Sequence, residues 1–416
     1  MKIAIITSGF LPVVDGVTVS GYCRLQKLSQ WGHEVVLFCP DYSDLSHVYP
    51  QWQEYTGKIL PGVRVVNLAS NPFMDLDFER NVAWRSYGTL WQELEQFQPD
   101  IIHVDEPERL FIGFWRVAGV KFARKAGIPC VSFFRTNFLE YLEDYFIVPG
   151  VKLSTLEFAI RRMIISVYNS YDATLVSSTV THQKIINLGI KNSLYGNLLG
   201  FDAEKFALSL KSDNFFADKY ELAKIDKQIK LVFLGRLTPD KGWDFTLDAF
   251  EKLATKIPLE KLALIIIGDG PTRQEIESRL SKLTPHVYLL GRVAPEKIPA
   301  LLANCDVHVT TSEKETRGLT ILEAFASGIP VLAPNAGGVV ENIIDGENGF
   351  LFTPQNHQDF IEKLNLLVRN PQLRREMGQQ GSKCVSKYSW DETVGNLVAI
   401  WAEQIKQKKL EYRRDD

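Results

Sequence analysis

The sequence predicts an α/β protein built from two doubly wound domains. Short apolar runs such as KIAIITS and HEVVLFCP alternate with helical segments, as expected for parallel strands that helices cover on both faces. The alternation restarts after the polar stretch 208–228, which indicates a second domain. The length of 416 residues agrees, because about 150 residues is an ordinary domain size.

The first domain is expected over residues 1–205. A loop that contains Gly16 follows its first strand and leads into a helix that ends near Trp31. Further helices are expected over residues 78–97 and 109–126. The expected strands are residues 2–8, 33–40, 63–69, 99–104 and 128–134.

The second domain is expected over residues 206–389. Its helices are expected to follow Gly242, Pro271 and Gly318, and a further amphipathic helix is expected near residues 390–408. The expected strands are residues 229–235, 262–268, 287–291, 306–311 and 329–333.

Composition excludes several classes of protein. A net charge of −3 provides no general attraction for nucleic acid. Five cysteines without a CxxC pair indicate a reducing compartment, with neither structural disulfides nor zinc. The opening MKIAIITSGFLPVV does not resemble a signal peptide, and no apolar window approaches the ~18 residues of a membrane span. We therefore expect a cytoplasmic protein, with contact at a membrane surface still open.

Glycine-containing loops follow the strands of the second domain, where doubly wound sheets bind ligands. These loops read GRLTPDKGW, GDGP, GRVAPE, TTSEKETRGL and NAGG. Arg236 and Lys241 share the first loop, directly after Gly235. A single cation there would usually be a solvated surface charge, whereas two cations on one strand-end loop favour an anionic ligand.

Two glutamates, Glu315 and Glu323, flank the start of the helix at Gly318. A helix N-terminus has unpaired N–H donors and positive potential, so a phosphate would bind well there. Glu323 would then lie near a ribose, and Glu315 near the group attached to the far phosphate. The alternative is that Glu315 only favours a helix start while Glu323 is exposed, but this leaves the surrounding glycine loops unexplained.

These motifs, with the E-x7-E spacing and GFDAEKF at 200–206, resemble the retaining GT-B family of nucleotide-sugar glycosyltransferases. The resemblance implies two Rossmann-like domains facing across a cleft, with the last helix crossing back to the first domain. It assigns the diphosphate to Arg236 and Lys241, the ribose to Glu323 and the donor sugar to Glu315. It also assigns the remaining donor contacts to Gly16, Gly235, Arg292, Val293, Gly318 and Leu319.

The implied mechanism is electrostatic. Cleavage of the sugar–phosphate bond develops negative charge on the leaving diphosphate, and Arg236, Lys241 and the helix start are fixed donors aimed at it. No carboxylate nucleophile, cofactor or metal is expected. The DLD triplet that contains Asp75 and Asp77 resembles the short motif that binds metal in the other glycosyltransferase fold. Helix capping by Asp75 or Asp77 is the favoured interpretation here.

Two first-domain stretches resemble digalactosyldiacylglycerol synthases. DEPERL at 105–110 and RTNFLEYLEDYF at 135–146 are similar to the EEPEHL and HTNYLEY stretches of those enzymes. Arg135 replaces a histidine of the family, so a permanent cation stands where an imidazole would be. The acceptor residues that this resemblance implies are Asp105, Glu106, Arg135, Asn137, Glu140 and Tyr141.

A membrane acceptor requires a surface contact, for which two segments are candidates. Residues 109–125 contain five basic residues, four aromatics and no acid, and residues 152–170 add Lys152, Arg161 and Arg162. Such composition favours an anionic membrane surface. The alternative is an ordinary helix whose aromatics belong to the core.

The sequence therefore predicts a retaining hexosyltransferase that is peripherally associated with a membrane. The expected reaction transfers galactose from UDP-galactose to monogalactosyldiacylglycerol, giving digalactosyldiacylglycerol. One alternative is a sulfoquinovosyl or other hexosyl transfer to diacylglycerol or a soluble glycan. Another is a nucleotide-binding regulatory protein without catalysis.

Overall fold

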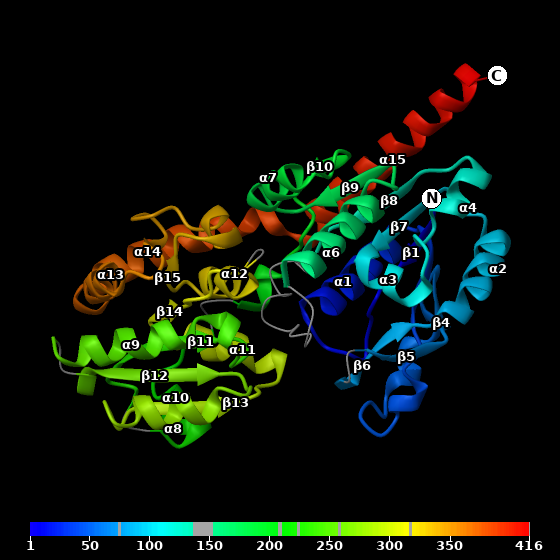
Figure 1. The fold of residues 1–416 in the computed structure, drawn as a ribbon. Helices are drawn as coiled ribbons and strands as arrows, with labels where there is room; N and C mark the ends of the chain where they lie inside the picture. The colour runs from blue at the N-terminus through cyan, green and yellow to red at the C-terminus, as the bar shows by residue number, and fades with distance from the viewer. Residues whose placement is uncertain are drawn as a thin grey trace. The chain divides into compact units, whose positions relative to one another are not determined.

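The computed structural model describes residues 1–73, 76–135, 153–206, 210–222, 225–256, 259–315 and 318–415. The chain divides into two compact units (Figure 1). Unit 1 is Met1–Gly200 with Trp390–Asp416, and unit 2 is Phe201–Ser389. Each unit has a largely parallel sheet between helices, which confirms the predicted class of two Rossmann-like α/β domains.

The unit 1 sheet has eight strands in the order β10-β9-β8-β7-β1-β2-β4-β3, and β3 alone of the eight pairs antiparallel to its neighbour. A separate hairpin joins β5 and β6. The strands are β1 (Lys2–Ile6), β2 (Glu34–Pro40), β3 (Gly57–Leu60), β4 (Val63–Leu68), β5 (Ser70–Phe73), β6 (Leu76–Val82), β7 (Ile101–Asp105), β8 (Cys130–Phe133), β9 (Ala173–Val176) and β10 (Ser193–Tyr195).

Successive side chains of β1 point to opposite faces of the sheet and pack into two different hydrophobic cores. Ile3 and Ile5 pack into the cluster that holds Trp401, while Ala4 and Ile6 pack into the opposite cluster. Trp401 is fully buried and comes from the last helix, so this helix is part of unit 1. The helices are α1 (Gly16–Gln30), α2 (Tyr87–Phe97), α3 (Pro107–Phe114), α4 (Val120–Ala126), α6 (Leu153–Tyr168), α7 (Thr179–Leu188) and α15 (Trp390–Asp415).

The prediction of a helix over residues 78–97 is wrong for the first half of this range. Residues 76–82 form β6, which pairs with β5, and the helix begins only at Tyr87. The buried Arg80 donates to the Ser70 hydroxyl at 3.0 Å and to Asp44 at 2.6 Å, and these contacts hold the hairpin. Asp77 therefore lies in a strand and does not cap a helix, while Asp75 lies outside the described residues.

The prediction of one continuous helix over residues 109–126 is also wrong. The chain forms α3, then a bend at residues 115–119, then α4. Trp115 adopts the left-handed region with φ of 54°, which ends α3, and Gly119 with φ of 75° precedes α4. Phe114 and Phe122 are buried in the core, so the core interpretation holds for these two aromatics.

The unit 2 sheet is parallel in all its pairs and has the order β13-β12-β11-β14-β15-β16. Its strands are β11 (Ile229–Leu234), β12 (Leu262–Ile267), β13 (Val287–Gly291), β14 (Val307–Val309), β15 (Val331–Pro334) and β16 (Gly349–Phe352). Its helices are α8 (Phe215–Tyr220), α9 (Trp243–Ala254), α10 (Arg273–Leu280), α11 (Ile298–Ala303), α12 (Leu319–Ala326), α13 (His357–Arg369) and α14 (Pro371–Cys384).

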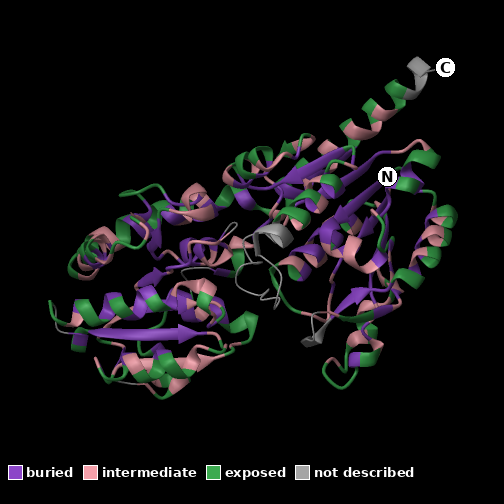
Figure 2. Cartoon of the chain, in the orientation of Figure 1, coloured by how far each residue is buried: buried purple, intermediate pink, exposed green. Residues whose placement is uncertain are grey.

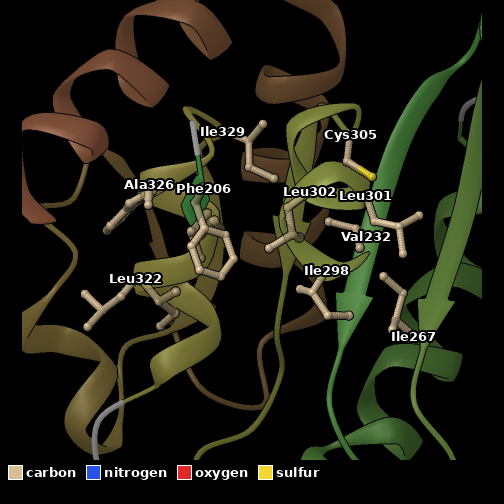
Figure 3. Packing of buried hydrophobic residues seen from close by; sticks show 14 of the residues in the cluster. Phe206, Val232, Ile267, Ile298, Leu301, Leu302, Cys305, Leu322, Ala326 and Ile329 are labelled. Atoms are coloured by element: carbon tan, nitrogen blue, oxygen red, sulfur yellow. The ribbon is translucent and has the colours of Figure 1, made fainter. Parts of the chain in front are cut away.

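Both faces of the unit 2 sheet are covered, as its near-continuous apolar strands predict. Figure 2 shows the strands as buried ribbons and the outward sides of the helices as exposed. Leu264 of β12 packs toward α9 and α13, whereas Ile267 packs toward α11 and α12. Figure 3 shows the second of these cores, in which Leu322 and Ala326 of α12 lie with Leu302 and Phe206. This core fixes α12 beside the carboxyl ends of the strands.

Among the described residues, no helix combines the length and apolar character needed to cross a membrane. The same residues contain no group of three or more His, Cys, Asp or Glu side chains that could hold a metal ion.

Candidate functional site

The loops after β11 and β12 of unit 2 lie in backbone contact. The N–H of Gly235 donates to the carbonyl oxygen of Ile267 at 3.0 Å, and the N–H of Leu237 donates to that of Asp269 at 3.0 Å. A Cβ on Gly268 would lie 1.8 Å from the carbonyl oxygen of Gly235, so no larger residue fits there. Glycine at 268 is therefore explained by this close approach, whereas Gly235 has open space for a Cβ and is favoured by its φ of 149°.

The loop after β14 is joined to the loop that carries Lys241. The Thr311 hydroxyl contacts the carbonyl oxygen of Gly242 at 3.0 Å, and the Ser312 hydroxyl donates to that of Asp240 at 3.3 Å. The hydroxyls of Thr311 and Thr246 lie 2.7 Å apart. Hydrogen bonds between neighbouring strand ends thus hold residues 311–315 beside residues 240–242.

The NAGG loop supports Glu315 from its other side. The N–H of Gly338 donates to the carbonyl oxygen of Glu315 at 2.7 Å. Gly337 has a φ of 62°, and a Cβ there would lie 2.7 Å from the carbonyl oxygens of both Glu313 and Glu315. The glycine pair is required for this approach, which fixes the backbone of Glu315.

Lys241 and Glu315 meet directly. The Nζ of Lys241 lies 2.6 Å from Oε1 of Glu315, and both side chains are largely buried, with exposed fractions of 19% and 24%. Arg236 on the same loop has a side chain that is 59% exposed. The structure thus brings the predicted lysine and glutamate together and leaves the arginine reaching into solvent.

Helix α12 begins beside this pair without a capping side chain. Gly318 is its N-cap in the left-handed region, with φ of 68°, so the N-cap residue has no side chain to bond to the first N–H groups. A Cβ at Gly318 would approach Ile321 to 2.8 Å. Leu319, the first helical residue, packs against the core of Figure 3. The helix start is therefore positioned firmly and keeps donors for a ligand.

A buried histidine anchors this first turn. His308 of β14 lies 3.1 Å from the carbonyl oxygen of Val232 through Nδ1 and 3.2 Å from the Thr320 hydroxyl through Nε2. Since a carbonyl oxygen only accepts, Nδ1 carries the proton and Nε2 accepts from Thr320. Burial lowers the pKa of His308 to about 4, which keeps the ring neutral.

Glu323 lies one turn further along α12 and is partly buried. Its carboxylate makes no hydrogen bond or ion pair with any residue that the structure describes. Burial raises the pKa of this carboxyl from 4.5 to about 7. The alternative interpretation of an exposed Glu323 is therefore not supported, and the group is open to donors that a ligand would bring.

The other predicted donor residues are dispersed. Arg292 is exposed and Val293 packs against the α12 core, both directly after β13. Gly16 belongs to unit 1, where it is the first residue of α1. Asp15 caps that helix by accepting from the N–H groups of Val17 and Thr18, both at 2.8 Å.

Asp105 in unit 1 is the centre of a buried ion cluster. Its side chain is 2% exposed and contacts the guanidinium of Arg24, while Arg135 Nε lies 3.7 Å away. Although burial raises the pKa of Asp105, Arg24 and Arg135 lower it well below its ordinary value. His103 also contacts this carboxylate at 3.1 Å. Asp105 is therefore a support for its neighbours, beneath the surface.

Arg135 and Glu106 lie at the same strand ends. Arg135 donates to the carbonyl oxygen of Val17 at 3.0 Å, and burial lowers its pKa. Glu106 accepts from the Ser8 hydroxyl and has a left-handed φ of 51°. The remaining predicted acceptor residues, Asn137, Glu140 and Tyr141, lie outside the described residues.

Sequence reasoning missed four residues that organise these sites. Asp240 lies inside the GRLTPDKG motif, so its position was available as a signal. His308 and Thr320 are joined across a strand and a helix, and Arg24 reaches Asp105 from α1, which no local pattern reveals.

Two family models match the chain in succession. The model described as glycosyl transferases group 1 matches residues 214–384, and the model described as glycosyltransferase family 4 matches residues 14–194. The first match contains the loops around Lys241, Glu315 and Glu323 described above.

Curated relatives cover much of the chain. A GDP-mannose-dependent alpha-mannosyltransferase of Mycolicibacterium smegmatis is 29% identical over 96% of this chain and 98% of its own length. A sulfoquinovosyl transferase of Arabidopsis thaliana is 29% identical over 74% of this chain and 59% of its own length. An alpha-monoglucosyldiacylglycerol synthase of Streptococcus pneumoniae is 25% identical over 80% of this chain and 71% of its own length.

Solved structures share the fold. Anabaena HepE in complex with UDP and glucose aligns with a TM-score of 0.70 at 19% identity, covering 97% of this chain and 100% of HepE. Sucrose-phosphate synthase from Thermosynechococcus elongatus aligns with a TM-score of 0.74 at 15% identity, covering 98% and 99% of the two chains. At these identities the comparison establishes the GT-B architecture alone.

The isolated carboxylate of Glu323 gives the free protein a specific pH dependence. Because its folded pKa of about 7 exceeds its ordinary value of 4.5, the folded state loses stability as pH rises between these values. Glu323→Gln should therefore stabilise the protein above pH 7 by about 1 kcal/mol or more, since one pKa unit corresponds to ~1.4 kcal/mol. Below pH 4.5 the gain should vanish.

Chemical denaturation of both proteins from pH 4 to 8 measures this difference. The exposed Glu362→Gln on α13 is the matched control and should show no such rise. A constant difference between wild type and Glu323→Gln across this range would contradict the buried, unpartnered carboxylate.

Proposed function

We propose that this chain is a glycosyltransferase of the group 1 family, and that it transfers a hexose from a nucleotide diphosphate sugar to a membrane glycolipid. The observation that carries the proposal is the convergence of Lys241, Glu315, the uncapped start of α12 and the unpartnered Glu323 at one edge of the unit 2 sheet. A non-catalytic nucleotide-binding protein would have no need of both glutamates.

The proposed donor occupies this edge in a defined order. The diphosphate accepts hydrogen bonds from Arg236, Lys241 and the first N–H groups of α12. The ribose hydroxyls donate to Glu323, which lies one turn further along the helix and has no other partner in the described part of the chain. Glu315 binds the hexose, and the turn at Arg292 and Val293 borders the base.

The chemistry proposed for this site is electrostatic and needs no metal. As the sugar–phosphate bond breaks, the electron pair remains on the diphosphate, where Lys241, Arg236 and the helix start stabilise the growing charge. The acceptor hydroxyl attacks the anomeric carbon from the face that the diphosphate leaves, so configuration is retained. Its proton passes to a phosphate oxygen of the leaving group.

The proposed acceptor is a diacylglycerol glycolipid. Stretches 105–110 and 135–146 are similar to those of digalactosyldiacylglycerol synthases, which supports UDP-galactose and monogalactosyldiacylglycerol as the substrate pair. Two relatives are named for sulfoquinovosyl transfer and for monoglucosyldiacylglycerol synthesis, which supports the lipid class more broadly. Transfer of sulfoquinovose or glucose to diacylglycerol is the alternative within this class.

A mannosyl transfer is the second candidate. It is favoured by the GDP-mannose-dependent relative, whose similarity extends over 98% of its length. Arg292 and Val293 would then border guanine instead of uracil.

Direct product identification tests the function. Purified protein incubated with UDP-galactose, UDP-glucose, UDP-sulfoquinovose or GDP-mannose, each with monogalactosyldiacylglycerol or diacylglycerol in mixed micelles, should yield one glycolipid detectable by mass. We expect digalactosyldiacylglycerol from UDP-galactose, with a rate unchanged by EDTA. Transfer only to soluble sugars would reject the lipid acceptor, and transfer from GDP-mannose alone would establish the second candidate.

The two cations should matter most for turnover. Arg236→Ala and Lys241→Ala should each lower kcat/KM by roughly 10²–10³, because the charge that they stabilise grows in the transition state. Lys282→Ala, at an exposed position of the same unit, is the matched control. Steady-state kinetics on correctly folded variants decides the matter, and near-normal rates would place the diphosphate elsewhere.

Two exposed tryptophans on unit 1 are proposed to contact the membrane. Trp115 is 74% exposed and Trp84 is 69% exposed, and Arg85 and Arg116 beside them are exposed as well. The Arg116 guanidinium lies 5.1 Å from the ring centre of Tyr87, and α3 packs against the Trp84–Ser86 turn, so these residues belong to one surface. We name this surface, Trp84, Arg85, Trp115 and Arg116, the tryptophan patch.

The tryptophan patch suits an anionic bilayer surface. Tryptophan is favoured at the interface between lipid and water, and arginine attracts anionic head groups. Trp115 also has a left-handed backbone, which is costly for a bulky residue, and its side chain gains little burial within the chain. Trp115 and Arg116 belong to the segment 109–125 that the sequence suggested, whereas the second suggested segment, 152–170, contributes no residue to this patch.

The double variant Trp84→Ala/Trp115→Ala should bind anionic liposomes about tenfold more weakly, because two aromatic side chains lose their burial in lipid. Added salt should weaken wild-type binding, since the arginine contribution is screened. Liposome sedimentation measures both effects, with Trp31→Ala, at the residue that follows α1, as the matched control. Equal binding by the double variant would contradict the assignment of this surface while leaving the transferase reaction untouched.

A further inference from the structure

Asp240, in the turn Pro239–Lys241, has a buried carboxylate without a hydrogen-bond donor. Its side chain is 1% exposed, and neither Oδ1 nor Oδ2 has a hydrogen-bond partner among the described residues. Among the residues that the structure describes, the cationic atoms near this carboxylate are the Arg236 guanidinium at 3.5 Å and the Lys241 ammonium at 3.9 Å. A buried carboxylate that lacks hydrogen bonds is costly, so its retention here requires an explanation.

The two cations nearest to Asp240 are those proposed to bind the diphosphate. Like charges on one short loop repel, and an anion between them offsets that repulsion. Lys241 also lies 2.6 Å from Glu315, so two cations face two carboxylates at this loop. A diphosphate that enters this site must compete with these carboxylates for the same cations.

We infer that Asp240 is a positioning residue that sets the affinity of the diphosphate site. It keeps Arg236 and Lys241 together while the site is free, and its negative charge opposes the diphosphate once the hexose has left. The nucleoside diphosphate product therefore dissociates more readily than it would from the two cations alone. This inference rests on the proposed function, because it takes the diphosphate to lie at these cations.

A purely structural role for Asp240 makes a different prediction. The Asp240 backbone carbonyl accepts from Ser312 at 3.3 Å, and an amide side chain leaves that bond in place. If Asp240 only shaped the turn, its replacement would change folding stability and weaken all ligands alike. An electrostatic role changes the affinity for phosphate-bearing ligands and leaves the nucleoside unaffected.

Calorimetric titration of wild type and Asp240→Asn with UDP, GDP, uridine and guanosine separates these roles. Asp240→Asn should bind the preferred diphosphate about tenfold more tightly, because one nearby negative charge is removed. Its affinity for the corresponding nucleoside should not change. In turnover assays, inhibition by that diphosphate should strengthen by a similar factor.

Two further variants complete the test. Asp240→Glu retains the charge and should bind diphosphate like the wild type. Asp248→Asn is the matched control, since Asp248 is half-exposed and pairs with Arg279 at 2.7 Å. Should Asp240→Asn fail to fold, Asp240→Ser removes the same charge with a smaller side chain.

Equal or weaker diphosphate binding by the uncharged variants overturns the inference, as does tightening by Asp240→Glu, while the proposed function stands. Failure of the wild type to bind either UDP or GDP overturns the proposed function and this inference with it.

Discussion

The edge of the unit 2 sheet that is proposed to bind the donor depends on backbone segments that lie in direct contact. Gly268 lies against the carbonyl of Gly235, and Gly337 lies against the carbonyls of Glu313 and Glu315. Side chains at these glycines would separate the loops that follow neighbouring strands. Their absence lets Lys241 and Glu315, which come from different loops, approach to 2.6 Å. The chemistry of the site thus follows from close backbone packing.

The two units use buried charge in opposite ways. In unit 1, Asp105 is surrounded by Arg24, Arg135 and His103, and its low pKa reflects this compensation. In unit 2, the partly buried Glu323 and the buried Asp240 have no hydrogen-bond donors among the residues that the structure describes. A carboxylate without hydrogen-bond donors costs stability. At Glu323 the proposed ribose would supply these donors, whereas Asp240 is proposed to oppose the diphosphate. The second pattern is typical of a binding site.

Features governed by local composition could be predicted from the sequence. The fold class was predicted from the apolar strands and the glycine loops. In the structure, Lys241 follows β11, Glu315 follows β14 and Gly318 precedes α12. Features governed by distant contacts could not be predicted. Residues 76–82 pair as a strand because Arg80 is held by Asp44 and Ser70.

The same limit applies to the site itself. Helix α3 ends early because Trp115 adopts a backbone conformation that its residue type disfavours. The partnerless state of Glu323 depends on the surroundings of α12, and the support of α12 by His308 depends on a strand ten or more residues earlier. Spacing in the sequence indicates which groups converge, but it does not indicate which of them are left without partners.

The central claim is that a nucleoside diphosphate binds along α12 with its ribose at Glu323. A crystal structure of the protein with UDP or GDP bound tests this most directly. The account predicts diphosphate oxygens within hydrogen-bond distance of Lys241 and of the first N–H groups of α12, ribose hydroxyls on the Glu323 carboxylate, and a Lys241–Glu315 separation longer than the present 2.6 Å. A nucleotide bound away from α12, or one whose ribose does not touch Glu323, would contradict it.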